Sequence, residues 1–192
     1  VDPRRFTDHV DRDYSIAKAI ETYSHEYAMH FPQIQWDAGR PAKTSALYST
    51  LKEKGAAFGS YGGWERADWF PRDGETEHQA DSYDRQPWFD AVAAECHHVA
   101  EHVGVLDLSG FSRFELKGKG ARAWLDGMVT GRIPKPGRIG LIYFASEKGK
   151  VLTEMTATYF DDDHRGLSDG AGAHRNGREW MRDDLPGDGS HT

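Results

Sequence analysis

The sequence is short of cysteine and of long apolar runs. Its 192 residues contain a single cysteine, Cys96, which excludes a disulfide framework and favours a reducing compartment. No apolar run approaches the about 20 residues that a membrane-spanning helix needs. No charged-then-apolar leader follows Val1. We therefore expect a cytoplasmic protein without a signal peptide or a membrane partner.

Two further absences limit the function. No G-x-G-x-x-G follows a strand and opens a helix, so we expect no dinucleotide-binding domain in this chain. The formal net charge is −7, and an acidic chain repels polyanions, which disfavours a nucleic-acid partner. With 38% hydrophobic residues, the chain can bury one core, or one core and a smaller appended unit.

The stretch from Gly104 to Phe160 changes its apolar period three times. Phe114 and Leu116 alternate with charged residues, as in a half-buried strand. A helical period follows over Ala121 to Met128, and Pro134 to Gly137 predicts a turn. Two apolar runs then predict an antiparallel hairpin: Ile139 to Ala145 and Val151 to Phe160. Strand, helix and paired strands indicate an α+β fold.

The residues before this stretch predict three helices and a loop. The apolar positions Ile16, Ile20, Tyr23 and Tyr27 mark one helix, which we expect to end near Pro32. A shorter helix around Leu47 and Leu51 closes at Gly55. Phe58 to Phe70 interleaves glycine with aromatic residues, which favours a long loop that packs its rings or lines a ligand. An apolar face from Phe89 to Val103 predicts a helix with Cys96 in the core.

The segment His98-Val99-Ala100-Glu101-His102 matches the H-x-x-E-H pattern of zinc peptidases. In that pattern two histidines one helical turn apart hold the metal. The match is a weak indication in a chain with ten histidines, and no downstream helix supplies a clear third carboxylate ligand. We therefore favour exposed helix histidines over a metal-dependent hydrolase and expect no metal site.

The same central stretch is rich in basic side chains although the chain is acidic. A positive surface of this kind suits an anionic small molecule, and solvated strand and turn charges are the alternative. The basic residues are Arg113, Lys117, Lys119, Arg122, Arg132, Lys135, Arg138, Lys148 and Lys150.

Several separate blocks resemble one family in order and spacing. They are Gly63-Trp64-Glu65-Arg66-Ala67, Gly104 to Ser109 and Val151 to Thr156. These blocks resemble the folate-binding, aminomethyltransferase-like domain of the FAD-dependent dimethylglycine and sarcosine dehydrogenases, which is related to the T-protein of the glycine cleavage system. Upstream, Trp36 to Pro41 and Lys43 to Ser45 are similar to the end of the middle domain of those flavoenzymes.

The resemblance implies a T-protein-like antiparallel sheet with packed helices, incomplete at the C-terminus. Residues 1–55 would be the end of the middle domain, and residues 56–192 the N-terminal part of the folate-binding domain. The expected cofactor is tetrahydrofolate, which takes up the one-carbon unit released by oxidative N-demethylation. FAD would be bound by a flavin domain or subunit of a longer parent enzyme, in the mitochondrial matrix if the source is eukaryotic.

The resemblance also implies the site. T-proteins carry an acidic pair where this chain has Thr153 and Glu154, so Glu154 is the implied catalytic acid. The implied cofactor-binding residues are Tyr143, Trp64, Arg113 and Thr153. Tyr143 would replace a T-protein tyrosine whose position is taken by Leu141.

On a strand Glu154 shares a face with Leu152 and Thr156, so it could point into a pocket, and a solvent-facing glutamate is the alternative. Asp161 to Gly170 is almost wholly polar where the family has an apolar strand, so we expect that strand to be missing. Arg175 to Met181 still resembles the following helix of the family. The alternative function is a non-catalytic partner or remnant that keeps the T-protein-like fold.

Overall fold

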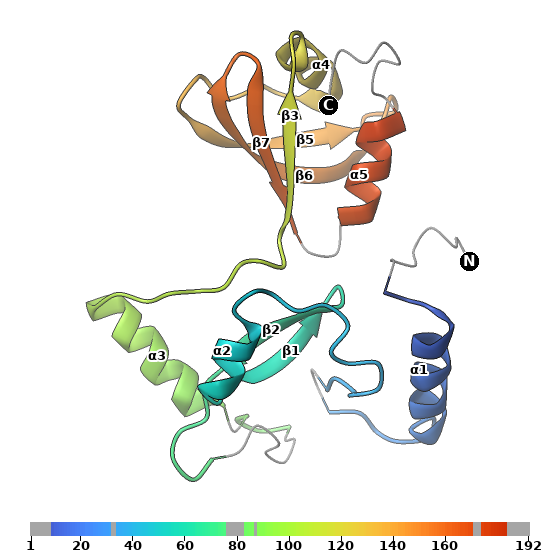
Figure 1. Cartoon of the computed structure of the whole chain (residues 1–192), viewed down its shortest axis with the longest axis vertical. Helices are drawn as coiled ribbons and strands as arrows, with labels where there is room; N and C mark the ends of the chain where they lie inside the picture. Colours follow the sequence, from blue (N-terminus) through green and yellow to red (C-terminus); the bar gives the residue numbers. More distant parts are fainter. Residues whose placement is uncertain (1–8, 32–33, 76–82, 87, 171–173, 184–192) are drawn as a thin grey trace. The chain divides into compact units, whose positions relative to one another are not determined.

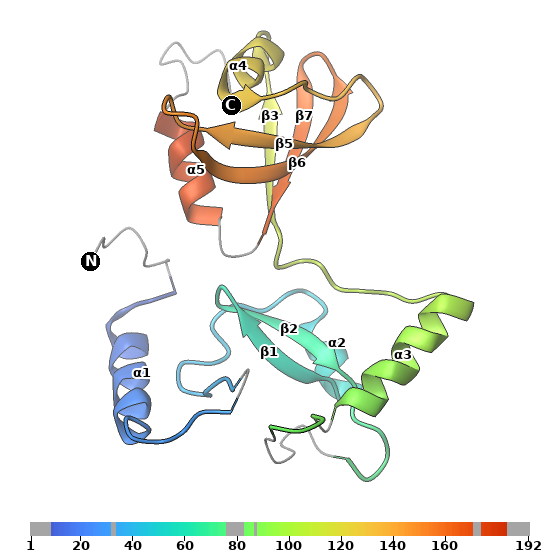
Figure 2. The same cartoon turned by 180° about the vertical axis from the view of Figure 1, so that it is seen from behind.

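The computed structural model describes residues 9–31, 34–75, 83–86, 88–170 and 174–183. The chain divides into two compact units, residues 1–110 and 111–192 (Figures 1 and 2). The first unit contains a two-stranded hairpin, and the second contains a five-stranded antiparallel sheet. In the described part of the chain, no helix is long and apolar enough to cross a membrane.

The first unit surrounds a hairpin that the sequence analysis missed. Its elements are α1 (Arg12–Ser24), α2 (Tyr48–Glu53), β1 (Ala57–Tyr61), β2 (Trp64–Trp69) and α3 (Phe89–Glu101). The predicted loop over Phe58 to Phe70 is wrong, because Tyr61 pairs directly with Trp64. Gly62 and Gly63, at φ 60° and 84°, form the two-residue turn between them. Only glycine adopts two successive left-handed positions cheaply, so these glycines mark a hairpin.

Helix α1 is shorter than predicted. It begins after Asp11, whose carboxylate accepts a hydrogen bond from the Tyr14 N–H at 2.8 Å. It ends at Ser24, so Tyr27 lies beyond it and is 95% exposed. Pro32, the predicted stop, lies outside the described residues. No residue of α1 is buried. Tertiary packing therefore does not stabilise further helical turns as far as Tyr27, the last apolar position of the predicted pattern.

Helix α3 contradicts the prediction of a core cysteine, because Cys96 is exposed. Only Ala91 is buried on this helix. It joins Ala57 and Trp69 of the hairpin in a small cluster that covers the N-terminal turns of α3. A hairpin of two short strands is too small to cover a helix of 13 residues, so the apolar face beyond that cluster stays exposed.

The second unit is an antiparallel sheet in the order β3-β7-β6-β5-β4. Its elements are β3 (Ser112–Lys117), α4 (Ala121–Met128), β4 (Val129–Thr130), β5 (Ile139–Ala145), β6 (Val151–Asp161), β7 (His164–Asp169) and α5 (His174–Asp183). The predicted strand, helix and hairpin over Ser112 to Asp161 are confirmed. The helix predicted over Arg175 to Met181 is confirmed as part of α5.

One face of the sheet carries the core. Ile142, Phe144 and Met155 from β5 and β6 are buried together with Leu125 of α4 and Met181 of α5. Both helices therefore pack on the same face of the sheet (Figures 1 and 2). We call the opposite side of the sheet the outer face.

Strand β7 shows that the expectation of a missing strand is wrong. The polar segment pairs with β3 on one side and with β6 on the other. Arg165, Leu167 and Asp169 are buried and alternate with less buried residues. Their period of two is that of a strand, and the charged side chains concealed it. The guanidinium carbon of Arg165 lies 4.3 Å from the ring centroid of Tyr159.

Candidate functional site

Strand β6 turns Glu154 to the outer face. Met155, Ala157 and Tyr159 are buried in the core, so the alternation of the strand directs the residues between them to the other side. Glu154 is exposed, and Leu152 beside it on the same face is 50% exposed. The predicted acid therefore lies on an accessible surface of the sheet rather than in the core.

Strand β5 supplies the neighbours of Glu154. Tyr143 is its direct cross-strand partner, and Leu141 pairs with Thr156 in the same register. Directly opposite residues of an antiparallel pair have their Cβ atoms about 4.5–5.5 Å apart. The structure thus brings together two predicted site residues, Tyr143 and Glu154, with leucine side chains on either side of them. This arrangement offers an aromatic ring for stacking and a carboxylate for hydrogen bonding or proton transfer.

Arg113 lies on the outer face two strands from β6. The register pairs it with Ser168 of β7, and Ser168 pairs with Thr156 of β6. Its side chain is exposed, in line with Thr156 across the sheet. The structure therefore places a cation on the same face as Tyr143 and Glu154.

Thr153 is not brought together with Glu154, although the two are adjacent in sequence. Its Oγ1 donates a hydrogen bond to Asp169 Oδ2 at 3.0 Å, and Asp169 is buried. Thr153 therefore lies on the core side of β6 and ties this strand to the end of β7. Trp64 belongs to the first unit, where Lys43 Nζ lies 5.9 Å from its ring centroid.

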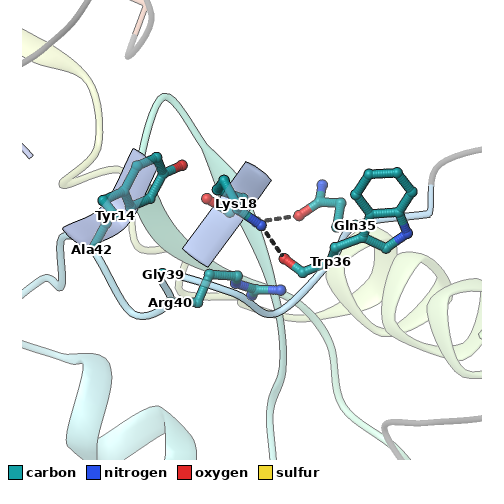
Figure 3. Close-up of a pocket in the computed structure, with 8 residues that line it drawn as sticks. Tyr14, Lys18, Gln35, Trp36, Gly39, Arg40 and Ala42 are labelled. Atoms are coloured by element: carbon teal, nitrogen blue, oxygen red, sulfur yellow. Dashed lines mark hydrogen bonds between the residues drawn. The ribbon is translucent and has the colours of Figure 1, made fainter. Parts of the chain in front are cut away.

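The first unit contains a small pocket of about 200 Å³ (Figure 3). Its lining includes none of the predicted site residues: Tyr14, Lys18, Gln35, Trp36, Gly39, Arg40, Ala42 and Ser60. Enclosed ligand sites usually measure about 300–1,000 Å³. This pocket is smaller, and its two cations already have carboxylate partners.

Those partners are Glu21 and Glu65. Lys18 Nζ donates to Glu21 Oε2 at 2.9 Å and to the Trp36 carbonyl at 2.8 Å, the latter visible in Figure 3. Arg40 donates to both carboxylate oxygens of Glu65, at 2.9 and 2.7 Å. The hydrogen bond to Glu65 raises the pKa of Arg40 although burial opposes it. The sequence analysis missed the ion pair of Arg40 and Glu65. The available signal was that each of two blocks resembling the family contains one of these opposite charges.

Two family models cover most of the chain. The family model described as GCVT N-terminal domain matches residues 47–192, and that of the FAD dependent oxidoreductase central domain matches residues 1–45. The chain belongs to the GCVT family. The predicted family and the predicted T-protein-like α+β fold are both confirmed.

Relatives and a solved structure agree with this assignment. The mitochondrial dimethylglycine dehydrogenase of Mus musculus is 32% identical over 184 residues, which are 95% of this chain and 21% of that protein. The 4-methylaminobutanoate oxidase (formaldehyde-forming) of Paenarthrobacter nicotinovorans is 40% identical over 122 residues, or 63% of this chain and 15% of the oxidase. The glycine cleavage system aminomethyltransferase T of Bartonella henselae superposes with a TM-score of 0.58 at 19% identity, covering 76% of this chain and 36% of that structure. The chain thus spans about a fifth of the length of the mouse relative.

Proposed function

We propose that this chain is a segment of a dimethylglycine/sarcosine dehydrogenase-like enzyme that binds tetrahydrofolate and transfers the one-carbon unit from oxidative N-demethylation. The observation that supports this most directly is the cross-strand pair of Tyr143 and Glu154 on the outer face. Residues 1–55 would end the flavoenzyme middle domain, and residues 56–192 would begin the folate-binding domain. FAD and the oxidation belong to the flavin domain or subunit of the parent enzyme.

In this proposal the outer face binds the pterin ring. The Tyr143 ring stacks on the flat heterocycle, and Leu141 and Leu152 extend the apolar surface beneath it. The Glu154 carboxylate accepts a hydrogen bond from the pterin and takes up the proton that N5 loses as it attacks the methylene carbon of the iminium. The bond from this carbon to the substrate nitrogen then breaks, the demethylated amine leaves with a proton, and N10 completes 5,10-methylenetetrahydrofolate. Arg113 offers a positive charge for the anionic end of the ligand. We expect the rest of the parent enzyme to cover this face and exclude water.

Thr153 has a positioning role in the same proposal. Its hydrogen bond to Asp169 fixes β6 against β7 and so holds the strand that presents Glu154. Trp64 stays a predicted cofactor-binding residue. The setting would be the cytoplasm, or the mitochondrial matrix in a eukaryote, in keeping with the word mitochondrial in the name of the mouse relative.

A titration of tetrahydrofolate into the purified chain, followed by calorimetry, tests the proposal. We expect binding in the micromolar range that weakens about tenfold or more in Glu154→Gln, because a hydrogen bond to a charged group contributes about 1.5–3 kcal/mol. Glu147→Gln is the matched control, since Glu147 is an exposed glutamate in the turn that joins β5 and β6. Equal effects of the two variants would contradict the role of Glu154.

A non-catalytic partner or remnant is the second candidate. It is favoured by the replacement of the first acid by Thr153, which faces Asp169 instead of the outer face. This candidate predicts a folded chain, by circular dichroism, that shows no tetrahydrofolate binding at all.

A further inference from the structure

The end of α3 has a side-chain geometry that the proposed function does not use. The imidazole rings of His98 and His102 have their centroids 4.8 Å apart and their planes inclined by 36°. Both side chains are exposed. His102 is the C-cap of α3, and its N–H donates to the His98 carbonyl at 2.8 Å, which fixes the backbone between the two rings.

The ring spacing fits a shared metal ion. A metal bound to imidazole nitrogen at about 2.0–2.1 Å lies about 3.2 Å from the ring centroid. Two such rings are therefore about 4.5 Å apart at a right angle around the ion and about 5.2 Å apart in tetrahedral geometry. The observed 4.8 Å lies between these values, so the separation of the two rings is compatible with one nitrogen of each binding a common ion once the ring planes turn.

The electrostatic setting also favours a cation. The C-terminal end of a helix carries the negative end of its dipole, and His98 and His102 lie there. The chain has a net charge of −7, which attracts cations to its surface. Glu95, one turn before His98, is already engaged, because its carboxylate accepts a hydrogen bond from the Phe70 N–H at 3.1 Å.

We propose that His98 and His102 bind one divalent late first-row transition-metal ion, such as Cu²⁺, Ni²⁺ or Zn²⁺, with water in its other positions. Imidazole ligands select these ions over Mg²⁺ and Ca²⁺, which need oxygen ligands. Among the described residues, no group of three or more His, Cys, Asp or Glu side chains could hold a metal. The site is therefore a two-ligand chelate that joins the last turn of α3 to its C-cap, and not the centre of a hydrolase.

The test is a titration of the full chain with CuCl₂, ZnCl₂ and MgCl₂, followed by calorimetry and by Cu²⁺ electron paramagnetic resonance. We expect one Cu²⁺ bound through two imidazole nitrogens, weaker Zn²⁺ binding in the same place and no Mg²⁺ binding. His98→Ala and His102→Ala should each weaken Cu²⁺ binding by about tenfold or more.

His97→Ala is the matched control, because His97 is exposed on the same helix but has no ring contact with the pair. It should leave Cu²⁺ affinity and the resonance spectrum unchanged, and circular dichroism should show the same helix content in all variants. Equal weakening by His97→Ala and His98→Ala, or a spectrum with one nitrogen ligand, would overturn the proposal.

Discussion

Replacing Arg165 by methionine should keep or raise the stability of the second unit. Arg165 is 1% exposed on the core side of β7, and its Nη1 donates to the Asp162 carbonyl at 2.6 Å. Its Nε and Nη2 are buried without a hydrogen-bond partner among the described residues, and Nη2 lies 3.9 Å from the nearest Asp162 carboxylate oxygen. A buried charge with unsatisfied donors is costly, and its replacement by an apolar residue of similar volume is often neutral or stabilising.

The magnitude follows from opposing contributions. Each of the two unsatisfied nitrogens costs about 1–3 kcal/mol. Against this, methionine loses the hydrogen bond to Asp162, about 1.5–3 kcal/mol, and the cation–π contact with Tyr159, about 0.5–2 kcal/mol. The gain of about 2–6 kcal/mol and the loss of about 2–5 kcal/mol nearly cancel, so we expect Arg165→Met to leave the free energy of unfolding unchanged or to raise it by about 1 kcal/mol.

Urea denaturation followed by far-UV circular dichroism measures this change. Arg165→Ala is the comparison, because it removes the same charge but leaves a cavity, and it should lower the free energy of unfolding by about 2 kcal/mol or more. A loss above about 1.5 kcal/mol in Arg165→Met would refute the reasoning, since it would mean that the guanidinium is fully satisfied.

Three further substitutions and one pH dependence test other parts of the chain. Gly63→Ala should cost about 1–2 kcal/mol in urea denaturation, because Gly63 has φ 84° and an added Cβ would lie 2.5 Å from the His9 ring. Gly127→Ala, in α4 with open space around it, should instead add about 0.5–1 kcal/mol. Glu65→Gln should cost about 1.5–3 kcal/mol in the same assay, because the partly buried Arg40 guanidinium loses its bidentate carboxylate and, among the described residues, keeps only the carboxylate of Asp37, whose Oδ1 lies 3.6 Å from Nη1. Burial raises the pKa of Glu21, but hydrogen bonds from Ala38 and Lys18 outweigh it and hold that pKa below 4.5. The stabilisation by Glu21 is therefore complete above the pKa that Glu21 has in the unfolded chain, and it is lost as pH falls through the lower pKa of the folded state. NMR of the Glu21 carboxyl carbon against pH measures the folded-state pKa.

The sheet of the second unit was predictable because its signals are local. The alternation at Phe114 and Leu116 gave β3, and two apolar runs around a polar turn gave the β5–β6 hairpin. The helical spacing of Ala121 and Leu125 gave α4, where both residues are fully buried. In each segment the hydrophobic period and the tertiary burial agree, so the sequence pattern was enough.

Two of the failures, at β7 and at Cys96, share a physical cause, because burial there depends on distant parts of the chain. Strand β7 has charged residues on its core side, and only pairing with β3 and β6 makes it a strand. Cys96 lies on an apolar helix face, but the β1–β2 hairpin that packs on α3 is too short to reach and bury it. The β1–β2 hairpin was missed for a different reason, because the turn Gly62-Gly63 was taken for part of a loop.

The candidate site was predictable in part. The alternation of β6 places Glu154 on the same face of the sheet as Leu152 and on the other face from Met155, as the strand period predicts. The pairing with Tyr143 depends on the register of the hairpin, and the contact of Thr153 with Asp169 joins residues 16 positions apart. Neither contact is visible in the sequence alone, so the roles of these side chains needed the structure.

The most direct test of the central claim is the NMR signal of the Tyr143 ring during a titration with tetrahydrofolate. Tyr159 is the internal control, because it is buried on the core side of the same sheet. A pterin site on the outer face predicts that the Tyr143 ring resonances shift with saturation while those of Tyr159 stay unchanged. Unchanged Tyr143 resonances at saturating tetrahydrofolate would contradict a pterin site on the outer face.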